Sequence, residues 1–192
     1  MAKSKGNRIL KGVRGRIGKT IYVRQRKDGM QILSNMPGAR DRNKIPPGQR
    51  KGIDRFQEAM IWARMQMRSQ EIKALYAGGV TITKTAAFRV AMSDYLNPPK
   101  IHYIRARNYT GKAGDLITVK ATDDFRVVRV EVKVYNCEGK VIEKGDAVNV
   151  KLKPFMWRYK TTLDNPKVAG SMIKARAFDR PGNEVEAVYN FD

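Results

Sequence analysis

Apolar and polar residues alternate most strictly in the second half of the chain. Over residues 125–135 (FRVVRVEVKVY), Val128, Val130, Val132 and Val134 recur at every second position between polar or aromatic residues. This period of two is that of a β-strand with one buried face. The turn-forming sequence NCEG follows at once. The pattern therefore predicts a strand, a tight turn and a partner strand directly after it.

Seven or eight short strands are expected beyond residue 99. Besides the pair just described, the candidates are residues 101–107, 116–121, 147–152, 155–163, 171–178 and 184–191. Turn signals separate them at the short intervals typical of an antiparallel β-sandwich of immunoglobulin-like (Ig-like) type. Trp157 and Phe178 are the expected core rings of this sandwich.

The middle of the chain has a helical composition instead. Residues 54–77 (DRFQEAMIWARMQMRSQEIKALYA) are rich in good helix formers and are followed by a Gly-Gly pair, so one helix is expected there. A shorter helix is expected from residue 83 or 85 to residue 96. Asn97, Pro98 and Pro99 stop the helix there, because a residue before proline is disfavoured in the helical conformation. The two prolines mark a predicted domain boundary.

The long helix carries more apolar residues than one face can hold. Phe56, Met60 and Met67 form a stripe that is expected to face the core, whereas Trp62 and Met65 lie off it. A single apolar stripe covers only part of a helix surface. Trp62 and Met65 are therefore predicted to be exposed anchors of a protein interface. The alternative is a helix surrounded on all sides by its own chain.

The first 53 residues combine bases, glycines and prolines. Two β-leaning runs flank Asp28-Gly29 within residues 19–34, and Asp-Gly is a strong hairpin signal. Residues 35–53 are rich in Pro and Gly and are expected to form a linker. The predicted organisation is α+β: a basic arm, hairpin and linker (1–53), a helical segment (54–97) and an Ig-like β-sandwich (98–192).

Positive charge is concentrated at the N-terminus. The 192-residue chain carries a formal net charge of +21, and residues 1–55 hold 16 Lys or Arg against 3 Asp or Glu, a net +13. A segment of this kind repels itself, so it is expected to be ordered only when a polyanion or an acidic protein surface neutralises it. The arm therefore indicates a binding partner that is anionic.

Nucleic-acid backbone is the expected partner, and a non-enzymatic structural or assembly protein is the expected function. The alternative is a virion or particle accessory protein whose arm lies on an acidic protein shell. An oligomer or a larger assembly is expected in either case, and a membrane is not expected as a partner. The candidate anion-binding residues are Lys3, Lys5, Arg8, Lys11, Arg14, Arg16, Lys19, Arg24, Arg26, Lys27, Arg40, Arg42 and Lys44.

Catalytic and metal chemistry find little support in the sequence. The chain has one cysteine, Cys137, and one histidine, His102, which is too few for an intramolecular disulfide or a Cys/His zinc site. His102 lies in a strand-like segment and no serine has a nucleophile-elbow context. No enzyme, cofactor or metal is therefore expected.

One cation site is left open. Asp123, Asp124, Asp179 and Asn183 offer oxygens of the kind that Ca²⁺ binds. The competing interpretation is that these side chains cap turns and strand ends.

Neither a long apolar run nor a secretory pattern appears in the sequence. Hydrophobic residues make up 42% of the chain, but they nowhere form the roughly 18-residue window that a spanning helix needs. The N-terminus MAKSKGNRIL also lacks the apolar stretch of a secretory signal. The expected location is the cytoplasm, or a particle assembled there.

Parts of the sequence resemble known bacterial modules. The segment NYTGKAGDLITVKATDDF, the Glu138-Gly139-Lys140 turn, the rings Trp157 and Tyr159, and AFDRPGN at 177–183 resemble the Ig-like domains of bacterial and phage accessory proteins. The motif GRIGKTIYVRQR, with the linker and helix that follow it, resembles the start of small basic uncharacterised bacterial proteins. The resemblance implies an Ig-like fold and a role in display, decoration or assembly.

Overall fold

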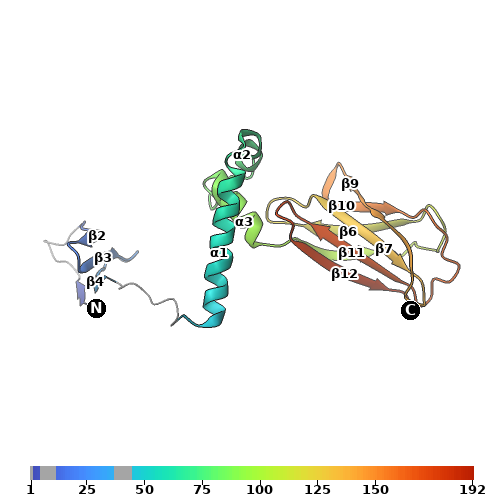
Figure 1. Ribbon diagram of the computed structural model, residues 1–192, viewed down its shortest axis with the longest axis horizontal. Coiled ribbons are helices and arrows are strands. Elements are labelled where there is room, and N and C mark those ends of the chain that lie inside the picture. Colours follow the sequence, from blue (N-terminus) through green and yellow to red (C-terminus); the bar gives the residue numbers. More distant parts are fainter. Residues whose placement is uncertain (1, 5–11, 37–44) are drawn as a thin grey trace. The chain divides into compact units, whose positions relative to one another are not determined.

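The computed structural model describes residues 2–4, 12–36 and 45–192. The chain divides into two compact units, Met1–Lys51 and Gly52–Asp192. The described residues form three helices and three antiparallel sheets, shown as ribbons in Figure 1. The expected mixed α+β class is confirmed. The second unit holds both the predicted helical segment (54–97) and the predicted sandwich (98–192), and the predicted boundary between these two parts stays a prediction.

The first unit is built around the predicted hairpin. Strands β3 (Ile21–Gln25) and β4 (Gln31–Asn35) pair antiparallel. Their turn is closed by Asp28, whose Oδ1 accepts a 3.1 Å bond from the Met30 amide. Gly29 has a φ of +79°, a conformation that glycine adopts at little cost. The Asp-Gly signal therefore predicted the turn correctly.

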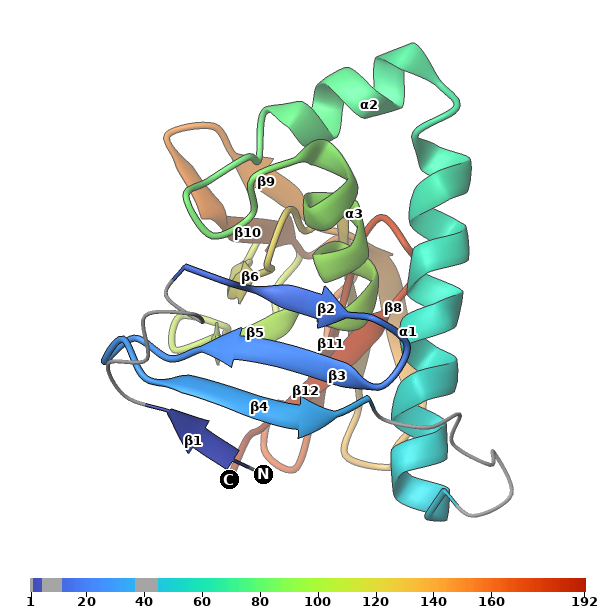
Figure 2. The ribbon, with the colours of Figure 1, turned by 90° about the vertical axis from the view of Figure 1, so that its left-hand side faces the viewer.

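Two short strands extend this hairpin into a four-stranded sheet. Strand β2 (Gly15–Ile17) pairs with β3, and β1 (Ala2–Ser4) pairs with β4, so the order is β1-β4-β3-β2 (Figure 2). The sequence predicts a basic arm here that is ordered only when an anionic partner neutralises it. That expectation is wrong for the two strands. Pairing with the hairpin strands gives their backbone N–H and C=O groups hydrogen-bond partners.

Three helices follow: α1 (Pro47–Gln66), α2 (Gln70–Ala77) and α3 (Ala87–Leu96). The single helix expected over residues 54–77 is wrong. Helix α1 begins earlier, at a proline, which suits the first helical position because it has no amide to leave unpaired. The helix is interrupted before Ser69, whose hydroxyl accepts a bond from the Ile72 amide and so caps a new helix.

A small core holds the helices together at one end of the sandwich. Ala63, Tyr76, Val90 and Ala91 are buried in it. The Tyr76 ring lies 4.6 Å from the ring of Phe125, which comes from the sandwich. The buried face of α1 consists of small residues. Ala59 and Ala63 are buried, whereas the expected core residue Phe56 is 50% exposed.

Eight strands form the rest of the second unit, and all the strands expected from the alternating pattern are present. Their bounds are β5 Lys100–Arg105, β6 Leu116–Thr122, β7 Arg129–Tyr135, β8 Val141–Asp146, β9 Val148–Val150, β10 Lys153–Lys160, β11 Met172–Phe178 and β12 Glu184–Asn190. One sheet has the order β5-β6-β10-β9 and the other β12-β11-β7-β8. The two sheets pack face to face as a sandwich (Figure 1).

The sandwich core alternates as expected over residues 130–134, whereas Val128 lies before β7 and is exposed, and one of the two expected core rings also differs. Val130, Val132 and Val134 are fully buried, and Trp157 is buried as predicted. Phe178, the second expected core ring, is instead half-buried on the outer side of its sheet, where Arg129 lies 4.3 Å from the ring centroid. The strand period explains the error, because its neighbour Ala177 takes the inward position.

Tyr159 on β10 packs closely against Gly145 on β8, a strand of the other sheet. A Cβ added to Gly145 on β8 would lie 2.7 Å from Cε2 of Tyr159, closer than real Cβ atoms come. The Tyr159 hydroxyl donates a 3.2 Å bond to Glu143, a buried residue of β8. Burial and the Glu143 charge raise the pKa of Tyr159 to about 12.

Candidate anion-binding surface

One face of the N-terminal sheet carries arginine and tyrosine side by side. Arg16 lies opposite Tyr22 in the register of β2 and β3, and Arg24 is two residues beyond Tyr22 on the same strand. Residues at these positions share one face, because directly paired residues and every second residue point the same way. The Arg24 guanidinium lies 5.5 Å from the Tyr22 ring centroid.

Nothing among the described residues of this sheet neutralises its bases. Residues 12–36 contain Arg14, Arg16, Lys19, Arg24, Arg26 and Lys27, all exposed. Their lone acid, Asp28, is held by the turn. Arg14 donates to the Gln25 side chain at 2.7 Å and Arg16 to the Gly18 carbonyl at 2.7 Å. Both acceptors are neutral, so these hydrogen bonds leave the charge of each arginine unpaired among the described residues. Uncompensated cations of this density attract polyanions.

The structure describes about half of the predicted anion-binding residues. Lys3 lies on β1, paired with Ile32, and the six bases of residues 12–36 are on or beside the sheet. The others, Lys5, Arg8, Lys11, Arg40, Arg42 and Lys44, fall outside the described residues.

The two predicted interface residues have different surroundings. Met65 is 58% exposed, and so is Ile61 one turn before it. Trp62 is half-buried: its ring centroid lies 6.1 Å from that of Tyr76 and 5.7 Å from that of Tyr95. Trp62 is therefore not the exposed anchor that was expected, because the break after α1 lets α2 fold back over it.

Three carboxylates meet where the helices join the sandwich. Asp94 from α3, Asp123 after β6 and Asp179 after β11 each offer an oxygen within 4.8 Å of the others. Asp94 and Asp179 are buried. Sequence reasoning missed Asp94, although a single acid in the mostly apolar helix sequence AFRVAMSDYL is the signal that marks it.

The oxygens of this cluster are mostly used by the fold. Asp179 accepts bonds from the Gly182 amide at 2.9 Å and from the Asn183 side chain at 2.7 Å. Asp123 accepts from the amides of Phe125 and Arg126 through Oδ2. Only Oδ1 of Asp94 and Oδ1 of Asp123 are buried there without a partner. Two free oxygens are few for Ca²⁺, which takes six to eight oxygen ligands.

A proton suits the cluster better than a cation. Burial raises the pKa of Asp94 to about 7, the negative charge of Asp123 adds to the effect, and the Tyr76 hydrogen bond opposes it. Burial likewise raises the pKa of Asp179. Near neutral pH one proton held on Asp94 relieves the repulsion with Asp123.

The remaining calcium candidates take part in other contacts. Asp124 pairs with Lys84 at 2.6 Å and accepts a hydrogen bond from Ser93. The Asn183 amide donates to the Tyr95 carbonyl at 3.1 Å as well as to Asp179. Both side chains connect the helical segment to the sandwich, in agreement with a turn-capping and linking role.

The residues considered for catalysis lie apart from one another. His102 is exposed on β5, with Nε2 at 2.7 Å from the Thr122 hydroxyl. Cys137 is free and exposed in the β7–β8 turn.

No helix of the described ranges is both long and apolar enough to cross a membrane.

Comparison with known proteins adds little. No family model matches the chain, and no curated protein matches it. CopC from Methylosinus trichosporium OB3b is similar at 16% identity and a TM-score of 0.37, over 48% of this chain and 90% of that chain. A lipoprotein from Bacteroides thetaiotaomicron is similar at 10% identity and a TM-score of 0.26, over 50% and 78%. Neither likeness is close enough to carry an argument.

Proposed function

We propose that the protein is a non-enzymatic structural or assembly protein that binds nucleic-acid backbone through its N-terminal unit. The observation that carries the proposal is one face of the N-terminal sheet, where Arg16 and Arg24 flank Tyr22 and have no acidic partner among the described residues. Arginine donates several N–H groups in a planar fork that matches phosphate oxygens. Four of the six bases in residues 12–36 are arginine, which favours phosphate over a diffuse acidic surface.

We also infer that the sandwich is Ig-like and serves as the protein-contact module. The strand orders β5-β6-β10-β9 and β12-β11-β7-β8 support this, since an Ig-like domain pairs its first, second, fifth and fourth strands in one sheet and the rest in the other. The extra strand β8 corresponds to an added edge strand beside the third. A rigid sandwich of this kind presents its loops and faces to partners without chemistry of its own.

The proposal is tested by the salt dependence of binding to a duplex oligonucleotide. The N-terminal variant replaces Arg16, Arg24 and Arg26 by Gln. The matched control, called the loop control below, replaces Lys73 on α2 and the loop residues Lys140 and Lys167 by Gln. These three exposed lysines of the second unit take part in no salt bridge among the described residues. Each variant lowers the formal net charge of +21 by three, so general charge effects cancel between them.

Wild type is expected to show log K falling steeply with log salt, with a slope near −5 if about six phosphates are contacted. The N-terminal variant should flatten this slope by roughly 3, and the loop control should change it little. Equal slopes for the two variants would overturn the proposal. The ultraviolet absorbance ratio of the purified protein, before and after nuclease and high salt, separates nucleic acid from the alternative acidic protein shell.

A further inference from the structure

The outer face of the β5-β6-β10-β9 sheet gathers bases that are far apart in the sequence. Arg105 lies opposite Thr118, and Thr118 lies opposite Arg158. Lys120 occupies the next outward position of β6, between Tyr103 and Met156. Since neighbouring strands are about 4.8 Å apart, the backbones of the two arginines are about 10 Å apart across the sheet. Lys120 lies on the strand between them, two residues beyond Thr118.

Tyr103 lies on the edge strand β5 of this sheet and contacts two of these bases. The Arg105 guanidinium lies 5.3 Å and the Lys120 ammonium 6.0 Å from its ring centroid. The Tyr103 hydroxyl contacts the Met156 sulfur at 3.6 Å. The ring therefore lies close to two cations at the sheet surface, and neither cation forms a salt bridge with a described residue. Lys160, also exposed, follows Arg158 by two residues on β10.

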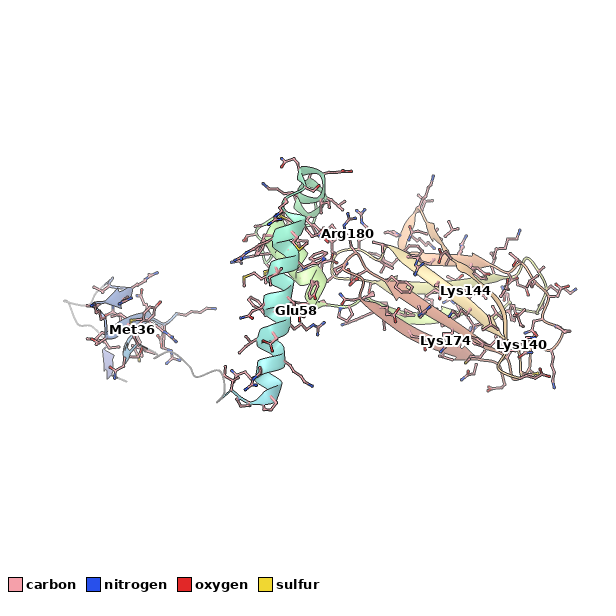
Figure 3. The ribbon with its side chains drawn as sticks, in the orientation of Figure 1. Met36, Glu58, Lys140, Lys144, Lys174 and Arg180 are labelled. Carbon is pink, nitrogen blue, oxygen red and sulfur yellow. The ribbon has the colours of Figure 1, made fainter. Side chains whose placement is uncertain are left out.

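The opposite face of the sandwich shows how this chain neutralises bases when it does so. Glu131 lies 2.7 Å from Arg176 and 3.0 Å from Lys144, and Lys174 lies 2.8 Å from Glu186. Although burial opposes it, the hydrogen bonds from Arg176 and Lys144 hold the pKa of Glu131 below its usual value. Figure 3 labels Lys144 and Lys174 on this charge-paired side.

The outward positions of β5, β6 and β10 hold no aspartate or glutamate. Three carboxylates lie at the borders of this face. Asp146 on β8 lines a pocket with Arg158 and Lys160, and Asp123 and Asp124 line another beside Lys100. Arg105, Lys120, Arg158 and Lys160 thus form an uncompensated basic patch, the sandwich patch, bounded by acids.

We infer that the sandwich patch is a second surface for nucleic-acid backbone. The inference rests on the proposed function, and it commits to phosphate because two of the four patch residues are arginine and none of the four forms a salt bridge with a described residue. A polyanion longer than either surface engages both, and the second contact then forms at the high effective concentration set by the first. The sandwich thereby adds to affinity as well as making protein contacts.

The test uses the full chain and the same duplex. The patch variant replaces Arg105, Lys120 and Arg158 by Gln, and the loop control described above removes the same three charges elsewhere. A charge-keeping variant, Arg105→Lys with Arg158→Lys, checks that loss of positive charge, and not a packing change, causes the effect. Thermal unfolding followed by circular dichroism confirms that each variant is folded.

The patch variant is expected to flatten the slope of log K against log salt by roughly 3, with the charge-keeping variant close to wild type. A patch variant that matches the loop control, while the N-terminal variant still flattens the slope, overturns this inference and leaves the proposed function intact. Equal slopes for the N-terminal variant and the loop control overturn the proposed function. A patch variant that flattens the slope in that case supports the sandwich surface on its own.

Discussion

The Tyr76 hydroxyl donates a 2.6 Å hydrogen bond to Oδ2 of Asp94, and both residues are completely buried. The bond joins α2 to α3, and the other oxygen of Asp94 lies in the carboxylate cluster with Asp123 and Asp179. The helical segment therefore meets the sandwich around a buried acid. Its protonation and its single donor are expected to govern how firmly the two parts are held.

Tyr76→Phe is expected to lower the free energy of unfolding by about 1–3 kcal/mol, because it leaves a buried carboxyl oxygen without its donor. Denaturant unfolding followed by fluorescence measures the change. Tyr95→Phe is the matched control, since the Tyr95 hydroxyl makes no hydrogen bond in the described residues and its loss should cost little. A Tyr76 variant as stable as the Tyr95 variant would show that the bond contributes nothing.

Stability is expected to fall as pH rises from about 4 to about 7. Asp94 has a folded-state pKa of about 7, above the value of about 3.9 expected for an unfolded aspartate. The protonated form thus favours folding below the unfolded pKa, and this contribution is lost as pH rises through the folded pKa. The contribution of Asp94 to the slope of the free energy of unfolding against pH is at most about 1.4 kcal/mol per pH unit.

Asp94→Asn checks this pH dependence, because asparagine keeps an oxygen for Tyr76 and cannot ionise. The variant is expected to be markedly less sensitive to pH over this window, with a smaller dependence remaining from Asp179, whose pKa is also raised by burial. Unfolding curves at several pH values provide the comparison. Parallel curves for wild type and variant would rule out Asp94 as the titrating group.

Trp157→Ala is expected to destabilise the sandwich by about 3–5 kcal/mol, because it empties a large space in a packed core. Trp157 is 7% exposed and belongs to the main core cluster. Phe178→Ala serves as the comparison: its ring lies half-buried on the outer side of the sheet, so its loss should cost clearly less. Thermal unfolding of both variants measures the difference, and equal losses would contradict the assignment of the core.

Met65→Glu is expected to weaken self-association without unfolding the chain, since the side chain is 58% exposed on α1. A buried charge at the centre of an apolar contact is unfavourable. Light scattering of wild type and variant over a range of concentrations measures the assembly. Lys73→Glu, on the exposed surface of α2, is the control. Wild type that stays monomeric at every concentration would remove the basis for an interface at this position.

The sandwich could be predicted because its information is local. Each strand buries every second side chain, so the alternation around Val130 to Val134 defines both the strand and its inner face. The Asp28-Gly29 turn is equally local, because its conformation depends on those two residues. The error at Phe178 marks the limit of the method, since apolar character alone does not tell which side of a strand faces inward.

The sandwich patch and the acid cluster could not be predicted in this way. Arg105, Lys120 and Arg158 become neighbours only through the pairing of β5 with β6 and of β6 with β10. Asp94 and Asp179 meet through packing of α3 on the end of the sandwich, which no periodicity records. The break after α1 was missed because the residues on either side of Ser69 are good helix formers, whereas Ser69 caps a new helix there.

The close approach of Gly145 and Tyr159 has a consequence for how sequences of this kind change over time. The tyrosine ring occupies the space that a side chain at position 145 would need. A residue larger than glycine there is therefore tolerated only with a smaller one at position 159, which in turn leaves Glu143 without its phenol donor. Positions 143, 145 and 159 are expected to vary together among homologues, as a coordinated triplet that reports this fold even where overall identity is low.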